Sequence, residues 1–346
     1  MHEFIDTKQP RVLSIALREG ICHMSHQTDR RTFVKSALAA PAAMALSMQA
    51  SGQAPDAPAP QDAAPVAALP QGKIGNLQVS RLLLGGNLLT HFTHSRDLKY
   101  VYNLAAHYNT DEKIIETMAV AEQNGINTLV IHTVPHVLDT LRKYRVEMGG
   151  KIQWIICPTA PVGNDLSEYA RQVEALVKDR CEAVYLWGVH SDKLVAEGRG
   201  EVIARLVALV KEHGIPSGVG AHDSNVIMYC EKNNVGADFY IKTLHHHKYP
   251  TAPKPHELTA AYAELPGYWC RDPQELVEFM ATVEKPWIAF KVMAAGAIEP
   301  ASAFQYAFKN GADHVLAGMF DYEIAEDARI ASDILSNLER TRPWRS

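Results

Sequence analysis

The chain has 346 residues, of which 47% are hydrophobic and 21% charged, so it can bury a large core and is too polar overall for an integral membrane protein. Its formal net charge of −5, without basic segments interleaved with aromatic residues, argues against a nucleic-acid partner. The five cysteines show neither a CxxC pair nor a zinc-finger spacing, which excludes a disulfide scaffold and a zinc finger.

Residues 1–50 resemble an export signal. Arg30 and Arg31 precede Lys35 and an Ala-rich apolar run, which is shorter than the roughly 20 residues that a membrane-spanning helix needs. This order is typical of a twin-arginine signal, so we expect a periplasmic or otherwise exported protein that has no membrane attachment after signal removal. Met24 is an alternative start of translation, and the competing interpretation is a chance arginine pair before an Ala-rich helix.

Residues 51–71 are rich in Ala, Pro and Gln, and this composition predicts a linker without a packed core.

The region 72–346 alternates between short apolar runs and amphipathic helical stretches. This alternation predicts parallel βαβ units, and eight of them match a single-domain (β/α)8 TIM barrel. A doubly wound sheet is the competing fold, but no GxGxxG motif follows the first run. The eight predicted strands lie within residues 81–86, 126–132, 152–159, 183–189, 216–222, 238–245, 286–296 and 313–320.

Two predicted helices have readable ends. Asp272 as N-cap, Pro273 at the first helical position and Glu275 two residues later form a candidate capping box. A second helix is expected to begin at Pro300 and to end at Gly311.

Histidines end four of the eight predicted strands. Chemistry in such barrels takes place where the carboxyl ends of the strands meet, and neutral imidazoles gathered there suit Zn, Mn or Fe. Because side chains alternate along a strand, His246 is assigned to packing or to the surface. The predicted metal ligands are His132, His222 and His245, with His247 as the second choice for the same strand end.

Lys291 lies within an otherwise apolar predicted strand, 286–296. An unpaired buried ammonium group is costly, so we expect the side chain to face the pocket, where burial would lower its pKa and make it a catalytic base or a cation for an oxyanion. The alternative is a lysine that reaches solvent from the strand edge or pairs with an acid. Asp223 and His190 are the other candidates for proton transfer, and Cys157 and Cys270 are left open as further site residues.

Two long connections, 87–110 and 248–271, are expected to cover the mouth of the barrel or to form a homo-oligomer interface. They mix aromatic, hydroxyl and amide side chains, which suits a small oxygen-rich, possibly sugar-derived, substrate.

Several segments resemble the aldo/keto reductases. "GKIGNLQVSRLLLGGN", "AEQNGINTLVIHT", "VYLWGVHSD", "GIPSGVGAHDSN" and "GADHVLAGM" are similar to the first, second, fourth, fifth and eighth units of that family's barrel, over about residues 72–335. The resemblance implies the barrel and an NAD(P) cofactor, with an Asp, Tyr, Lys and His tetrad. The tetrad is not matched: His132 stands at the aspartate position, Cys157 to Thr159 replace the lysine, and Trp187 or Gly188 falls at the histidine. The segment "GMFDYEIAEDARI" also lacks the expected partner of the NADP 2′-phosphate.

Three functional hypotheses follow. The first is an exported metal-assisted lyase, isomerase, epimerase or hydrolase that acts on a small-molecule substrate. The second is an NAD(P)-dependent oxidoreductase of the aldo/keto reductase type, which rests on fold resemblance. The third is a non-catalytic binding protein.

Overall fold

The computed structural model describes residues 69–346, so the predicted signal and most of the linker lie outside the described residues. An antiparallel hairpin of β1 (Gln71–Ile74) and β2 (Leu77–Ser80) comes first. Eight parallel strands then form a closed barrel in the order β10-β3-β4-β5-β6-β7-β8-β9. The predicted (β/α)8 barrel is confirmed.

Each predicted strand segment contains one strand of the barrel. The strands are β3 (Leu82–Gly85), β4 (Thr128–His132), β5 (Gln153–Cys157), β6 (Ala183–Leu186), β7 (Ser217–Ala221), β8 (Phe239–Thr243), β9 (Trp287–Phe290) and β10 (His314–Ala317).

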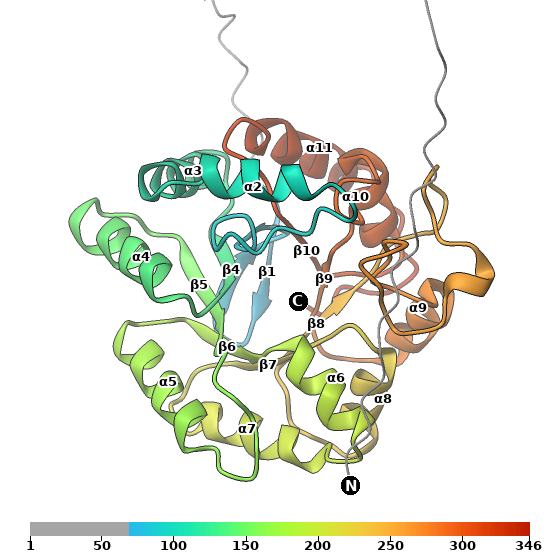
Figure 1. The fold of residues 1–346 in the computed structure, drawn as a ribbon, viewed down its shortest axis with the longest axis horizontal. Helices are drawn as coiled ribbons and strands as arrows, with labels where there is room; N and C mark the ends of the chain where they lie inside the picture. The colour runs from blue at the N-terminus through green and yellow to red at the C-terminus, as the bar shows by residue number, and fades with distance from the viewer. Residues whose placement is uncertain (1–68) are drawn as a thin grey trace, which may run out of the picture. The chain divides into compact units, whose positions relative to one another are not determined.

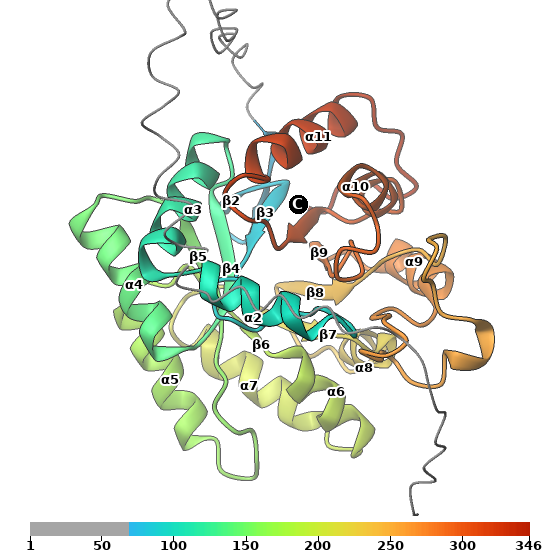
Figure 2. The same ribbon diagram turned by 45° about the horizontal axis from the view of Figure 1, so that its top comes forward.

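Helices surround the barrel as an outer ring (Figure 1). They are α3 (Asp111–Gln123), α4 (Pro135–Glu147), α5 (Ser167–Lys178), α6 (Gly188–Ala196), α7 (Glu201–Lys211), α8 (Ser224–Lys232), α9 (Pro273–Thr282), α10 (Pro300–Lys309) and α11 (Ile324–Ser336). Two additional elements lie in the long connections, α2 (Lys99–Tyr108) and the 3₁₀ turn η1 (Pro255–Glu257). Figure 2 shows α2 lying across the barrel. No helix in the described region is long and apolar enough to span a bilayer.

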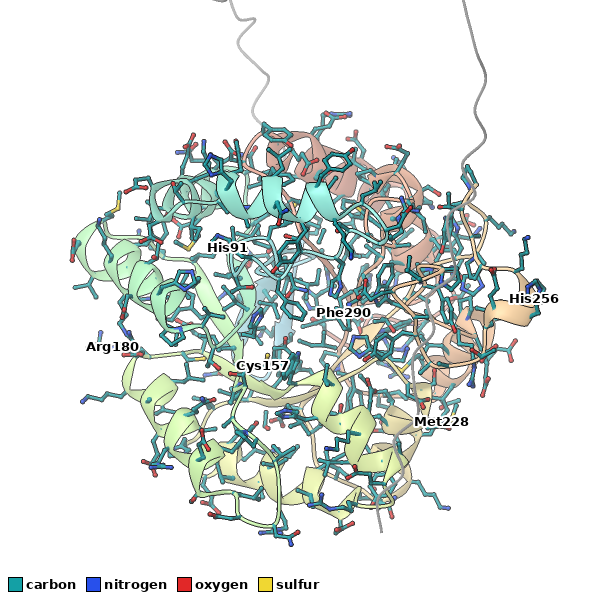
Figure 3. The ribbon with its side chains drawn as sticks, in the orientation of Figure 1. His91, Cys157, Arg180, Met228, His256 and Phe290 are labelled. Carbon is teal, nitrogen blue, oxygen red and sulfur yellow. The ribbon has the colours of Figure 1, made fainter. Side chains whose placement is uncertain are left out.

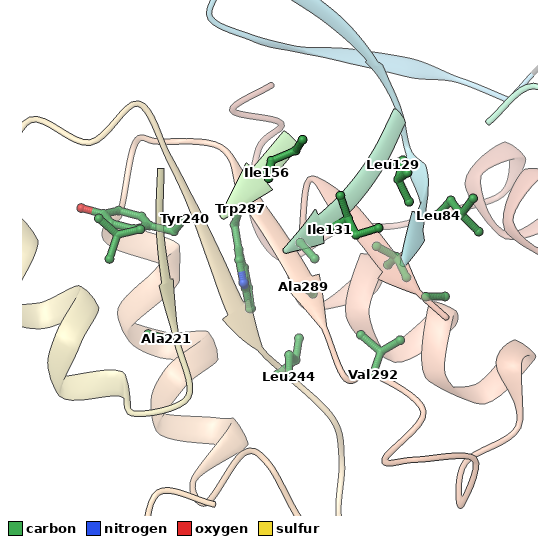
Figure 4. Close-up of a cluster of buried hydrophobic side chains, with 14 of the residues drawn as sticks. Leu84, Leu129, Ile131, Ile156, Ala221, Tyr240, Leu244, Trp287, Ala289 and Val292 are labelled. Atoms are coloured by element: carbon green, nitrogen blue, oxygen red, sulfur yellow. The ribbon is translucent and has the colours of Figure 1, made fainter. Parts of the chain in front are cut away.

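The two faces of each strand bury different parts of the core. Leu83, Val130, Ile155 and Ile288 point into the barrel and pack there with Ile74 of the hairpin. The residues that alternate with these along the strands point outward and pack against the helices; they include Leu84, Leu129, Ile131, Ile156, Tyr240 and Trp287 (Figure 4). Both faces are apolar because a parallel barrel is covered on both sides, which explains why the strands read as continuous apolar runs.

One predicted helix end differs in detail. Pro273 is the first residue of α9, as expected, but the Asp272 side chain makes no capping hydrogen bond. Its Oδ2 instead accepts a hydrogen bond from Arg271 Nε at 2.5 Å. The capping-box prediction is therefore wrong, because a neighbouring guanidinium competes for the carboxylate. The predicted limits of the other helix agree with α10, which begins at Pro300 and is followed by Gly311 at φ +102°.

The C-terminal segment is attached beneath the barrel by a buried ion-pair network. Asp313 is fully buried, and its Oδ2 lies 2.6 Å from Nη1 of Arg342, which is 1% exposed. The Arg342 guanidinium also donates to the carbonyl groups of Gly311, Val283 and Lys285. These bonds connect the end of the chain to the loops that precede β9 and β10.

Candidate functional site

A cavity of about 670 Å³ opens at the carboxyl ends of the barrel strands. This volume is within the range of small-molecule sites, roughly 300–1,000 Å³. Phe290 lies near the centre of the barrel in Figure 3 and is one of the residues that line the cavity. Side chains from both long connections and Val101 and Ala105 of α2 complete the wall. The sequence-based expectation that these connections cover the mouth matches this arrangement.

Lys291 stands directly after β9 and lines the cavity. The backbone has φ +54° at this residue, a left-handed conformation that is rare for a non-glycine side chain. Such strain is concentrated at functional sites, because it needs support from the surrounding structure. Lys291 therefore lies one residue beyond the strand that the sequence placed it in, and it faces the pocket as expected.

The Lys291 ammonium group is in contact with a histidine and a glutamate from the two long connections. Its Nζ lies 2.7 Å from His94 Nε2, and His94 Nδ1 lies 2.6 Å from Glu264 Oε1. A neutral His94 with hydrogen on Nδ1 satisfies both contacts, donating to Glu264 and accepting from Lys291. Trp269 packs beside the pair, with its ring centroid 5.2 Å from Lys291 Nζ and 5.7 Å from the His94 ring.

This environment shifts the pKa values of the two charged groups. Burial lowers the pKa of Lys291 from 10.5 to about 7, and the carboxylates of Glu264 and Asp192 oppose the shift only in part. Burial disfavours the charged form of Glu264, but the hydrogen bond from His94 and the nearby charge of Lys291 outweigh it and lower the pKa of that carboxyl. Near neutral pH, a substantial fraction of Lys291 is a free amine.

We expect one lysine of the folded protein to titrate near pH 7, whereas exposed lysines titrate near about 10.4. Reductive ¹³C-methylation followed by NMR titration measures this, and the Lys291→Met variant identifies the resonance. The Glu264→Gln variant should lower the midpoint further, because the Glu264 charge raises the pKa of Lys291. A Lys291 midpoint above about 9 would contradict the environment described here.

His222 forms a second polar pair in the cavity wall. Its Nδ1 lies 2.7 Å from Asp192 Oδ2, and Asp192 also accepts the backbone N–H groups of His222 and Asp223. Burial lowers the pKa of His222 more than the bond to Asp192 raises it. With hydrogen on Nδ1, the ring leaves Nε2 as a hydrogen-bond acceptor.

His132 also lines the cavity, but aromatic rings surround it. It stacks on Trp187 with ring centroids 6.4 Å apart and meets the edge of Phe92 at 5.7 Å. Burial lowers its pKa to about 4, so the ring is neutral at pH 7.

The three consecutive histidines hold the second long connection in place. His245 Nδ1–H donates to the carbonyl of His246, and its Nε2 accepts the backbone N–H of Trp269 at 2.9 Å. His247 Nε2–H donates to the carbonyl of Cys270, and His246 Nε2 lies 3.0 Å from Ser302 Oγ. His245 has no ring nitrogen left for a metal ion.

The predicted metal centre is not assembled. Within residues 69–346, no group of three or more His, Cys, Asp or Glu side chains is placed to hold a metal ion. His132 and His222 reach the cavity, whereas His245 and His247 lie outside its wall. The expectation of converging imidazoles is therefore wrong. The strand fixes the backbone position of each histidine, whereas the adjacent loops determine what its ring contacts.

The two other predicted acid–base residues lie outside the cavity wall. Asp223 is the N-cap of α8 and accepts the backbone N–H of Asn225. His190 lies in α6 with its ring 5.2 Å from that of Trp187. Asp192, two residues further along α6, is the group that contacts a cavity histidine, His222.

Cys157 and Cys270 are buried, and neither lines the cavity. Burial raises the pKa of both thiols, that of Cys157 to about 12, so both remain protonated near neutral pH.

Sequence reasoning did not assign roles to His94, Asp192 or Glu264. Only the unusual length of the two connections indicated that His94 and Glu264 could approach the strand ends. No comparable sequence signal marked Asp192, which lies within an ordinary helix.

No protein-family model matches the chain, and no curated protein sequence matches it. Solved structures show the same fold. A Pseudomonas aeruginosa protein provisionally assigned as an aldo-keto reductase is 18% identical, with a TM-score of 0.52 over 77% of this chain and 94% of its own. The aldo-keto reductase AKR11C1 from Bacillus halodurans is 11% identical, with a TM-score of 0.50 over 80% of this chain and 100% of its own. Gox0644, solved as a single-residue variant in complex with NADPH, is also 11% identical, with a TM-score of 0.50 over 79% of this chain and 90% of its own. These similarities show the fold, a TIM barrel that the chain shares with these proteins.

Proposed function

We propose that this protein is an enzyme that transfers a proton at a carbon next to a carbonyl group of a small hydroxylated substrate, with Lys291 as the base. The contact of Lys291 with the His94–Glu264 pair inside the cavity carries this proposal. A lysine with a pKa near the working pH is suited to general base catalysis.

The neutral Lys291 amine takes the proton from the substrate carbon and becomes an ammonium group. The electron pair of the C–H bond moves toward the carbonyl and gives an enolate. Proton return to the same carbon gives exchange or epimerisation. Isomerisation needs one more proton transfer: the proton of the hydroxyl group on the deprotonated carbon passes to the enolate oxygen, and the ammonium group of Lys291 then returns its proton to the former carbonyl carbon. His94 accepts a hydrogen bond from Lys291 and Glu264 fixes His94, so both orient the amine. The free Nε2 of His222 can accept a hydrogen bond from a substrate hydroxyl group.

The metal-assisted hypothesis loses support because its ligand set is not assembled. The oxidoreductase hypothesis is the second candidate, and it is favoured by the fold neighbours, one of them solved with NADPH.

The charges of the cavity do not fit a dinucleotide. Barrels of this type frequently bind phosphate with the loops after the last two strands and a helix N-terminus. Here, Glu299, Glu323 and Asp327 line that side of the cavity, and Lys291 is the only lysine or arginine of its wall within the described region. Three carboxyl groups at this position would repel a pyrophosphate. We therefore derive no step through NAD(P).

Deuterium exchange tests the proposal. Incubated in D₂O with glyceraldehyde, dihydroxyacetone and related hydroxycarbonyl compounds, the protein is expected to incorporate deuterium next to a carbonyl, which NMR measures. Titration with NADPH, followed by its fluorescence, is run in parallel. Saturable nucleotide binding with no exchange would reject the proposal and support the oxidoreductase; absence of both would reject the proposal as well.

A further inference from the structure

Carboxyl groups gather on one side of the cavity, between the N-termini of α10 and α11. Glu299 is the N-cap of α10, Glu323 is the N-cap of α11, and Asp327 lies in the first turn of α11. All three line the cavity. Helix N-termini favour nearby carboxylates, so the helices account for part of this arrangement.

Asp327 is not explained by the helix. It is 4% exposed, and within residues 69–346 its carboxyl group takes part in no hydrogen bond or ion pair. Glu323, by contrast, is engaged, because its Oε2 accepts the backbone N–H of Phe320 at 2.9 Å. Burial and the neighbouring charges of Glu323 and Glu326 raise the pKa of Asp327 to about 7. A buried carboxyl group without a partner is costly, and this one borders an open cavity.

Aromatic rings adjoin these acids. Phe320 lines the cavity and stacks on Tyr322 with centroids 5.5 Å apart and an interplanar angle of 6°. Tyr108 meets the Phe320 ring edge-on at 5.5 Å, and Tyr322 is 67% exposed. Aromatic faces attract cations, and quaternary ammonium groups in particular.

We propose that the substrate carries an organic cation, a protonated amine or a quaternary ammonium group, which binds between Asp327, Glu299 and the Phe320 ring while the carbonyl group faces Lys291. A neutral polyol could donate hydrogen bonds to these carboxylates as well, but only a cation offsets the repulsion among them. The placement of the carbonyl group rests on the proposed function, whereas the cation site stands on its own residues.

The test compares choline with its uncharged isostere 3,3-dimethylbutan-1-ol. Binding of each compound to the full-length protein is measured by calorimetry or ligand-observed NMR. Choline should bind at least about tenfold more tightly than the isostere. The Asp327→Asn variant should reduce this ratio by about tenfold, because it removes the charge and keeps the shape. Ethanolamine distinguishes the two kinds of cation. If ethanolamine binds more tightly than choline, the site prefers a protonated amine; if it binds more weakly, the site prefers a quaternary ammonium group.

Glu326→Gln is the matched control. Glu326 lies on the same helical turn, pairs with Arg329 at the surface and does not line the cavity, so this variant should keep the choline preference. Three results would overturn the cation site. Choline and the isostere could bind equally well, choline could fail to bind at about tens of millimolar, or Asp327→Asn and Glu326→Gln could change choline binding equally. The Lys291→Met variant should retain choline binding even if it loses deuterium exchange, so failure of the proposed function would leave the cation site measurable.

Discussion

Replacement of Lys291 by methionine should slow deuterium exchange into a hydroxycarbonyl substrate by a factor of about 10²–10⁴, the usual contribution of a positioned general base. Methionine retains much of the length of the side chain and removes the amine. The left-handed backbone at position 291 costs about the same conformational free energy with methionine as with lysine, because neither residue is glycine. The exchange rate per molecule of enzyme, followed by NMR, is the measurement.

Lys248→Met is the control for loss of a lysine near the barrel mouth, because Lys248 is exposed and does not line the cavity. We expect it to exchange at the wild-type rate. Wild-type exchange by Lys291→Met would show that another group acts as the base. The circular dichroism spectrum of each variant distinguishes a loss of exchange caused by unfolding from one caused by removal of the base.

The largest expected effect on stability is at the buried ion pair below the barrel. Arg342→Ala should lower the free energy of unfolding by about 3–5 kcal/mol, because it leaves the fully buried Asp313 without its closest cation and three carbonyl groups without their donor. Arg340 remains at 3.4 Å from Asp313, which keeps the expected loss near the lower end of this range. Urea unfolding of the purified protein measures the change.

A surface arginine provides the comparison. Arg329 pairs with Glu326 and Asp333 in the open, so Arg329→Ala should change the unfolding free energy little. Where Arg342→Ala does not yield folded protein, Arg342→Lys keeps the charge with fewer donors and should give an intermediate loss. Equal stability of Arg342→Ala and Arg329→Ala would contradict the role of the buried pair.

The sequence predicted the strands well because their signal is local and repeated. Each run such as Thr128–His132 is apolar on both faces, as a barrel strand must be when helices cover it from outside. It also predicted that Lys291 faces the pocket, because an unpaired lysine within an apolar strand has few other low-energy positions.

The metal prediction shows the limit of the same reasoning. His245 stands at a strand end, as predicted, but its two ring nitrogens bind backbone groups of the chain. Likewise, strands β4 to β8 separate His94 from Glu264 in the sequence, and only the folding of two long loops over the mouth brings the two side chains together.

By itself, the sequence determined the barrel and the positions of its strand ends, because the apolar pattern that marks a buried strand or helix lies in residues that are close together in the sequence. The tertiary structure decided which of those side chains share a cavity. Contacts such as His94 with Glu264, His222 with Asp192, and the unpartnered Asp327 depend on the paths of loops and on the packing between helices, which no local pattern specifies.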